Sequence, residues 1–264
     1  MENVLKVHSI GEEYLYLLIK RCKKCGQKGA LECIKQSSLK SIDQKQHFDL
    51  VTAKCKKCGH EESLKFDTSS FFGDWDYYLR HCYVLNKSNE PSHIIDVVDY
   101  TNLALFNFNI LKEHLRKKDL SDDRLDFLAK ITQGCIKEAL KFYGSSEKFN
   151  EERSLFSEEN KKIYKNNKQQ YSFKYLRFLL SKINDVCNNL EAMKEIYGEL
   201  TGNPRKDIQH LRNLENKYKE NEEVRREISR LESMAIWELL PPEKKEKWRE
   251  IVKKGKPIWE EFEY

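Results

Sequence analysis

Two short cysteine motifs have the spacing of metal ligands. The sequence CKKCG occurs twice, so that Cys22 and Cys25 form one pair and Cys55 and Cys58 form a second. Two residues between the thiols allow one tight turn to direct both sulfurs at the same ion, and a second turn completes a tetrahedral site. We therefore predict that these four cysteines hold a structural Zn²⁺ ion. Iron stays open as the occupant, because four thiolates satisfy either metal.

The other cysteines have no partner at this spacing. Cys33, Cys82, Cys135 and Cys187 lie in apolar surroundings and are expected to be packed thiols. The N-terminal residues lack the basic-then-apolar order of a signal peptide, and no apolar run approaches the ~18 residues of a membrane span. We expect a cytoplasmic protein with no membrane partner, in a reducing compartment where paired cysteines bind metal rather than form disulfides.

Composition and motifs favour a binding protein over an enzyme. The chain of 264 residues is 34% charged, with a mean hydropathy of -0.78, which is typical of a soluble protein rich in solvated helices. The sequence contains no glycine-rich phosphate loop, HExxH, GxSxG or kinase motif set. A minor alternative is an enzyme whose site uses acids in the helical core, with Asp96 and Asp99 as candidates; helix-end or surface acids explain them more simply.

The segments around the cysteine pairs alternate as strands do. The patterns at 30–34, 48–53 and 62–66 predict short antiparallel strands, and 14–19 is expected to be a strand that leads into the first pair. Residues 36–46 are polar and are expected to form an excursion. The layout is that of a zinc ribbon over residues 10–68.

Residues 69–182 are expected to form a helical bundle. Pro91 and Ser92 open an apolar helix with Ser92 as its cap, Ser121 caps the next helix, and Gly144 ends it. Further helices are expected from Ser157 and over 173–183. The aromatic connector at 69–78 is expected to pack as core, with a stacking platform for bases as the alternative.

Residues 183–264 form a charged helical extension with an aromatic tail. Helices are expected on both sides of Gly202-Asn203-Pro204, with a break at Asn221 and a final basic helix over 243–254. The narrow apolar seam between dense charges predicts contact with a partner protein or a second copy through 204–264. The aromatic residues of 257–264 either dock on a partner or fold back onto the chain's own helices.

Lysines occupy the tips of both cysteine turns. Lys23, Lys24, Lys56 and Lys57 would cluster at one end of the ribbon, where they could contact phosphates of a nucleic acid without reading its sequence. The alternative is that solvent-exposed spacers are polar and lysine is an ordinary choice. Further basic residues nearby, Lys20, Arg21, Lys28 and Lys54, favour a basic patch, although a net charge of +5 alone does not indicate nucleic acid.

The first 180 residues resemble a loose group of uncharacterised bacterial zinc-ribbon proteins. The resemblance rests on the two CxxCG motifs, the aromatic connector, EPSHIIDVVDY at 90–100, EALKFY at 138–143 and SLFSEENKKIY at 154–164. It implies a ribbon followed by helices and metal ligation by the four paired cysteines, and it implies no activity. Residues from about 184 are not covered by it.

These observations predict an α+β protein that is mostly α, with a small N-terminal β zinc ribbon, a helical bundle and a charged C-terminal helical extension. The leading hypothesis is a non-catalytic zinc-ribbon binding protein in a nucleic-acid-associated or defence-type assembly. The alternative is a protein–protein interaction adaptor that acts through its C-terminal helices.

Overall fold

The computed structural model describes residues 4–41, 45–71, 84–117, 121–144 and 147–246. Contacts divide the chain into two compact units, the first comprising residues 1–111 and 121–184 and the second comprising 112–120 and 185–264. The predicted boundary at residue 68 stays a prediction. No described helix combines the length and apolar character needed to cross a bilayer.

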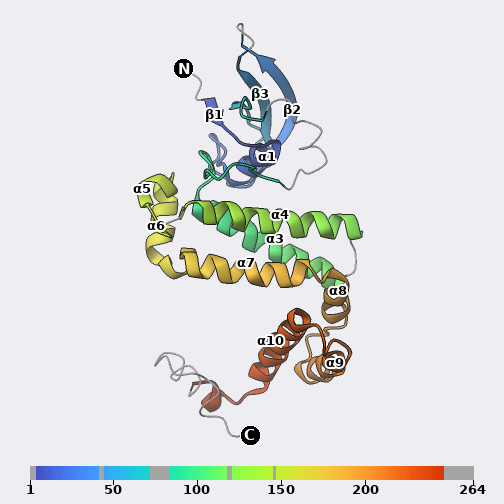
Figure 1. The fold of residues 1–264 in the computed structure, drawn as a ribbon. Coiled ribbons are helices and arrows are strands. Elements are labelled where there is room, and N and C mark those ends of the chain that lie inside the picture. The colour runs from blue at the N-terminus through green and yellow to red at the C-terminus, as the bar shows by residue number, and fades with distance from the viewer. Residues whose placement is uncertain (1–3, 42–44, 72–83, 118–120, 145–146, 247–264) are drawn as a thin grey trace. The chain divides into compact units, whose positions relative to one another are not determined.

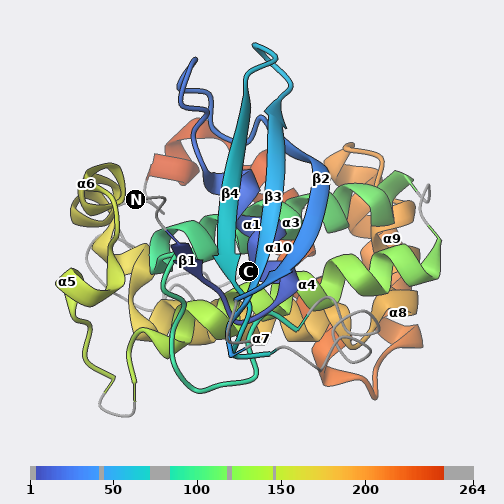
Figure 2. The same cartoon turned by 90° about the horizontal axis from the view of Figure 1, so that it is seen from above.

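A four-stranded sheet forms the N-terminal part of the first unit (Figures 1 and 2). The strands are β1 (Val4–Lys6), β2 (Leu31–Lys40), β3 (His47–Cys55) and β4 (Glu61–Asp67), in the spatial order β1-β4-β3-β2. Strands β2, β3 and β4 are antiparallel, whereas β1 pairs in parallel with β4. The strands predicted at 30–34, 48–53 and 62–66 are confirmed. Because β2 continues to Lys40, residues 36–40 belong to a strand, and the prediction of a polar excursion is wrong for them.

The strand predicted at 14–19 is also wrong, because these residues belong to helix α1 (Ile10–Ile19). Ser9 caps the helix by accepting a hydrogen bond from the Glu12 N–H, and the Glu12 carboxylate accepts one from the His8 N–H. This is a capping arrangement of the Ser-x-x-Glu type, which fixes the first turn as helix. Leu17 of α1 belongs to the same apolar core as the sheet residues Val51 and Phe66.

The rest of the first unit is helical, as predicted. Its elements are α3 (Val97–Lys117), α4 (Asp122–Lys141), α5 (Glu151–Ser154), α6 (Glu158–Asn166), the 3₁₀ helix η1 (Lys168–Tyr171) and α7 (Phe173–Cys187), of which residues 112–117 and 185–187 belong to the second unit. Helices α3, α4 and α7 lie alongside one another (Figure 1). Ser157 caps α6 as expected. The cap of α3 is Asp96 rather than Ser92, since Asp96 Oδ1 accepts from the N–H groups of Val98 and Asp99.

The second unit contains α8 (Leu190–Gly198), α9 (Pro204–Lys217) and α10 (Glu222–Leu239). Asn203 and Asn221 cap α9 and α10, which confirms the predicted break at Asn221. Helical backbone resumes over 242–246. The rest of the predicted helix 243–254, the aromatic residues 257–264, most of the connector 69–78 and Cys82 lie outside the described residues.

Candidate metal centre

The structure brings the four paired cysteines together. The sulfurs of Cys22, Cys25, Cys55 and Cys58 all lie within 4.8 Å of one another. The Cys22–Cys58 and Cys25–Cys55 sulfur distances are 3.6 and 3.7 Å. Four sulfurs about 2.3 Å from a central ion stand about 3.8 Å apart. Both the donor set and its spacing therefore fit a tetrahedral metal ion.

The two cysteine turns have the same backbone pattern, offset by 33 positions. Gly26 N–H donates to the Cys22 carbonyl, and Gly59 N–H donates to the Cys55 carbonyl. Each first cysteine in turn donates its own N–H to the carbonyl five residues later, on Gln27 in one turn and on His60 in the other. The second turn joins β3 to β4, whereas the first is flanked only by the single bridge between Arg21 and Lys28.

A glycine follows each cysteine pair because the backbone at that position is in the left-handed region. Gly26 and Gly59 have φ values of +69° and +71°, where other L-residues are strained. A Cβ built on either glycine would meet no atom within 4 Å. The requirement at both positions is therefore conformational rather than a matter of space.

Without a metal ion, the thiols of Cys22 and Cys58 have very different pKa values. The N–H of Cys25 points at the Cys22 sulfur and, with that of Lys24, lowers the pKa of Cys22 to about 6. The N–H of His60 acts likewise on Cys58, but burial and hydrogen bonds with the other thiols outweigh it and raise the pKa of Cys58 to about 12. A thiolate at one sulfur thus opposes ionisation of its neighbours, and a divalent cation would remove that penalty.

Both residues that flank the first cysteine turn contact the helices. The Arg21 guanidinium makes two contacts with the Glu159 carboxylate on α6, and it also donates to the Gly26 carbonyl inside the turn. Lys28 Nζ lies 2.7 Å from Asp99 Oδ1 on α3. These contacts connect the cysteine cluster to two helices of the first unit.

The acids proposed for a catalytic site have structural partners. Asn160 Nδ2 donates to both carboxylate oxygens of Asp96 and to Asp99 Oδ2. Asp96 also accepts from the Phe156 N–H and caps α3. Burial, followed by the neighbouring charge of Asp99, raises the pKa of Asp96. These contacts account for both carboxylates without a substrate.

A second buried acidic group lies between α1 and the sheet, and sequence reasoning missed it. Glu13 and Asp49 are 1% and 0% exposed. Gln36 Nε2 donates to both carboxylates, at 3.1 and 2.8 Å. Burial, with the nearby charge of Asp49, raises the pKa of Glu13 to about 9. Glu13 is therefore protonated at neutral pH. The signal for it would have been the adjacent acids Glu12 and Glu13, both of which are buried in α1.

The four lysines predicted to contact nucleic acid, Lys23, Lys24, Lys56 and Lys57, are all exposed. Two of them lie near acids: Lys23 Nζ is 3.4 Å from Glu62, and Lys56 Nζ is 2.9 Å from Glu32. Lys24 forms no ion pair with any residue that the structure describes. The nearby basic residues are also paired, Lys20 with Glu62, Arg21 with Glu159, Lys28 with Asp99 and Lys54 with Glu61. This end of the sheet is therefore less positive than its lysines alone suggest.

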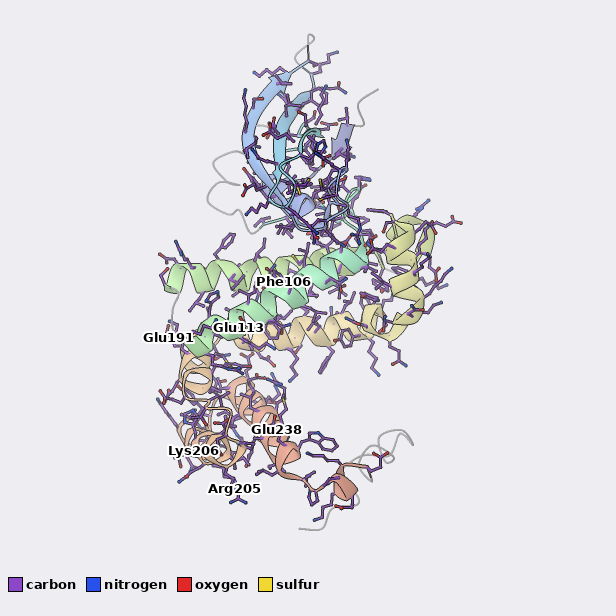
Figure 3. All side chains as sticks on the ribbon, turned by 180° about the vertical axis from the view of Figure 1, so that it is seen from behind. Phe106, Glu113, Glu191, Arg205, Lys206 and Glu238 are labelled. Carbon is purple, nitrogen blue, oxygen red and sulfur yellow. The ribbon has the colours of Figure 1, made fainter. Side chains whose placement is uncertain are left out.

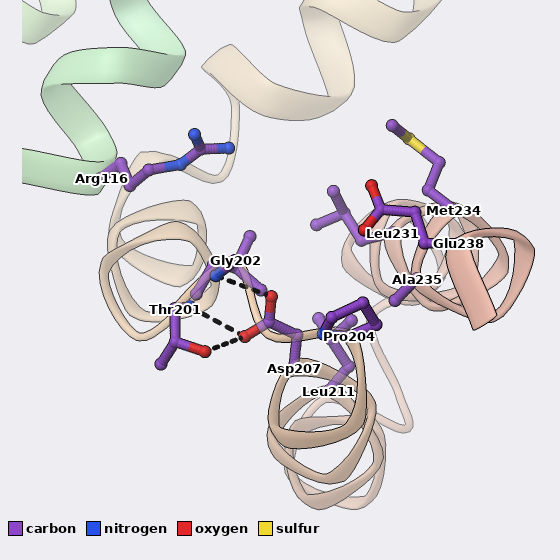
Figure 4. Close-up of a pocket in the computed structure, with 11 residues that line it drawn as sticks. Arg116, Thr201, Gly202, Pro204, Asp207, Leu211, Leu231, Met234, Ala235 and Glu238 are labelled. Atoms are coloured by element: carbon purple, nitrogen blue, oxygen red, sulfur yellow. Dashed lines mark hydrogen bonds between the residues drawn. The ribbon is translucent and has the colours of Figure 1, made fainter.

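The second unit has a cavity of about 360 Å³ beside the turn between α8 and α9 (Figure 4). Asp207 closes that turn by accepting from Thr201 and from the Gly202 N–H. Leu211 lines the cavity, as does Met234, which is 53% exposed. Glu238 on α10, labelled in Figure 3, also lines it.

The chain matches no protein-family model, no curated protein and no solved structure.

Proposed function

We propose that this is a non-catalytic binding protein whose four cysteines hold one structural Zn²⁺ ion. The observation that supports the proposal is the mutual approach of the four sulfurs to within 4.8 Å, at the spacing of a tetrahedral thiolate site. All four positions of the coordination shell would be filled by protein, which is typical of structural rather than catalytic zinc. When bound, the ion would supply the positive charge that lets all four thiols ionise.

The position of the site supports a structural role. Cys22 and Cys55 are 2% and 1% exposed and belong to the apolar core of the sheet. The first cysteine turn has little sheet pairing of its own. The ion would therefore hold this turn against the β3–β4 hairpin, and Arg21 and Lys28 would carry that constraint to α6 and α3.

Metal analysis of the purified protein tests the proposal. We expect about one zinc per chain for the wild type. We expect metal content near zero after dialysis for Cys25→Ser and Cys58→Ser. Cys33→Ser removes a thiol of β2 that is no ligand and should retain the zinc. Iron at a similar ratio, with the visible absorption of iron–thiolate bonds, would replace zinc as the occupant. No metal in the wild type, even after incubation with Zn²⁺, would refute the proposal.

Nucleic-acid contact by the four turn lysines is a second candidate function, favoured by their exposure and by Lys24, which pairs with no acid among the described residues. The ion pairs of Lys23 and Lys56 weigh against it. If this candidate is correct, changing all four lysines to glutamine should weaken binding to oligonucleotides while leaving the zinc in place, whereas unchanged binding would exclude it.

An adaptor role for the second unit is favoured by the cavity beside α10. The apolar residues of α9 and α10, among them Leu211, Leu214 and Ile228, are buried within the unit. A second copy of the chain is the occupant we propose for the cavity, since Met234, which lines it, is 53% exposed. Sedimentation velocity should show a dimer that Met234→Glu dissociates. A monomeric wild type at high concentration would exclude this role.

A further inference from the structure

A run of positive charge lies on α6, η1 and α7, away from the cysteine turns. Between residues 160 and 184 the sequence has seven basic residues and no acid, although the whole chain has 48 basic and 43 acidic residues. The seven are Lys161, Lys162, Lys165, Lys168, Lys174, Arg177 and Lys182. Such a local excess is the electrostatic footprint of a polyanion site.

Most of this charge is not used within the fold. Lys161 pairs with Glu158, and Lys168 lies 3.5 Å from Glu151. The other five basic residues form no ion pair with any residue in the described ranges: Lys162, Lys165, Lys174, Arg177 and Lys182. The turn lysines near the cysteines differ in this respect, because acids of the sheet neutralise two of them.

Amide side chains lie among these cations. An open hollow of about 610 Å³ lies at the turn from α6 to α7, lined by Lys165, Asn166, Asn167, Lys168, Gln169, Gln170 and Tyr175. Asn166 and Gln169 are exposed, and their side chains make no hydrogen bond within the part of the chain that the structure describes. Amides both donate and accept, so they suit sugar hydroxyls and base edges as well as phosphates.

Two aromatic rings adjoin the same cations. Phe178 on α7 is 57% exposed, and its ring centroid lies 6.5 Å from that of Tyr175, which lines the hollow. Lys182 Nζ lies 5.8 Å from the centre of the Phe178 ring. An exposed aromatic among cations is the arrangement on which unpaired bases stack.

We propose that this α6–α7 surface, made of Lys162, Lys165, Lys174, Tyr175, Arg177, Phe178 and Lys182, binds single-stranded nucleic acid. The cations would contact phosphates, and Phe178 and Tyr175 would stack on bases, which requires that the bases be unpaired. The surface does not depend on the metal or on the turn lysines.

An anionic membrane fits the surface less well. A helix that lies on a bilayer exposes a continuous apolar face. On α7 the apolar residues Leu176, Leu179 and Ile183 are buried, which leaves Phe178 alone exposed among them. The amide-lined hollow also favours a ligand with hydrogen-bonding groups.

Fluorescence anisotropy of the zinc-loaded protein with labelled oligothymidylate and oligouridylate of about 20 nucleotides tests the proposal. Five phosphate contacts predict that binding weakens about 100-fold between about 50 and about 200 mM salt. In the variant Lys162→Gln/Lys165→Gln/Lys174→Gln/Arg177→Gln, one contact remains, and the same change in salt should weaken binding only about threefold. Phe178→Ala should weaken binding roughly tenfold without changing the salt dependence.

The charge-matched control is Lys23→Gln/Lys24→Gln/Lys56→Gln/Lys57→Gln, which should bind like the wild type. Equal loss in both quadruple variants, or loss in the control alone, would overturn the proposal, as would no binding by the wild type at about 50 mM salt. Binding to vesicles with about 30% anionic lipid, but not to oligonucleotides, would likewise overturn it and assign the surface to a membrane. Circular dichroism confirms that each variant is folded.

Discussion

Arg21 and Glu159 lie 138 positions apart, yet their side chains form two parallel contacts, Nε to Oε2 at 3.1 Å and Nη2 to Oε1 at 2.6 Å. Arg21 immediately precedes the first cysteine of the cluster. Arg21, which contacts α6, is therefore bonded directly to Cys22, a proposed metal ligand. Changes at the cysteines should therefore be felt at α6, and the reverse should also hold.

Removal of the metal is expected to loosen the sheet more than the helices. Treatment with a chelator should increase amide hydrogen exchange in β3, β4 and α1, because the ion would hold the two turns together. Helix α4 should keep its protection, since its buried Leu125 and Ile136 do not belong to the apolar core that contains Cys22 and Cys55. Mass-resolved hydrogen exchange measures both regions. Equal loss of protection in α4 would show that sheet and helices unfold as one unit.

The Lys28–Asp99 ion pair is expected to stabilise the first unit. Asp99 is 9% exposed and receives hydrogen bonds from Lys28 and Asn160. Asp99→Asn removes the charge that both donors face, and it should lower the free energy of unfolding by about 1–2 kcal/mol. Urea denaturation measures this change. Glu113→Gln on the same helix, at an exposed position (Figure 3), should change stability by less than about 0.5 kcal/mol.

Glu13 should make stability depend on pH. Its pKa in the folded protein, about 9, lies above its ordinary value of 4.5, so the folded state holds this proton more tightly than the unfolded chain. Its contribution is therefore full below about pH 4.5 and is lost as pH rises towards 9. Between pH 6.5 and 8.5 the zinc-loaded wild type should lose about 1–3 kcal/mol relative to Glu13→Gln. Parallel stability curves for the two proteins would contradict this prediction.

The conformation of Gly59 predicts a graded response to substitution. Gly59 has a φ of +71°, and a Cβ added there would meet no atom within 4 Å, so Gly59→Ala should destabilise the protein by about 1 kcal/mol through backbone strain alone. Gly59→Asn should cost less, because asparagine tolerates this region better. Thermal unfolding of the zinc-loaded proteins shows which of the two variants is less stable. Equal stability of the wild type and both variants would show that the backbone at residue 59 is not strained by a side chain.

In the second unit, Glu227 is expected to be a stabilising residue. It is 5% exposed, accepts a hydrogen bond from Tyr197 and pairs with Arg230. Glu227→Ala leaves the half-buried Arg230 without its partner and should cost about 2–4 kcal/mol. Tyr197→Phe removes only one hydrogen bond and should cost about 1 kcal/mol. Urea denaturation monitored by circular dichroism measures the loss of unfolding free energy in both variants. A smaller loss for Glu227→Ala than for Tyr197→Phe would refute the role of Glu227.

Local patterns were sufficient to predict much of this fold and the cysteine cluster. The CxxCG spacing identified all four clustered thiols, and Asn221 marked the break between two helices, because both features depend on neighbouring residues. The error at α1 is also local, since the Ser9 and Glu12 capping pair was present in the sequence. By contrast, the contacts of Arg21 and Lys28 with acids far along the chain depend on tertiary packing, which spacing alone does not encode.

The unequal burial of the four cysteine residues has a consequence for their reactivity. Cys22 and Cys55 are almost fully covered, Cys58 is half-buried and Cys25 is exposed. Alkylating reagents and oxidants in the solvent would therefore reach Cys25 more readily than Cys22 or Cys55. Damage to the centre would begin at the second cysteine of the first turn, which has the least sheet structure around it to hold it in place.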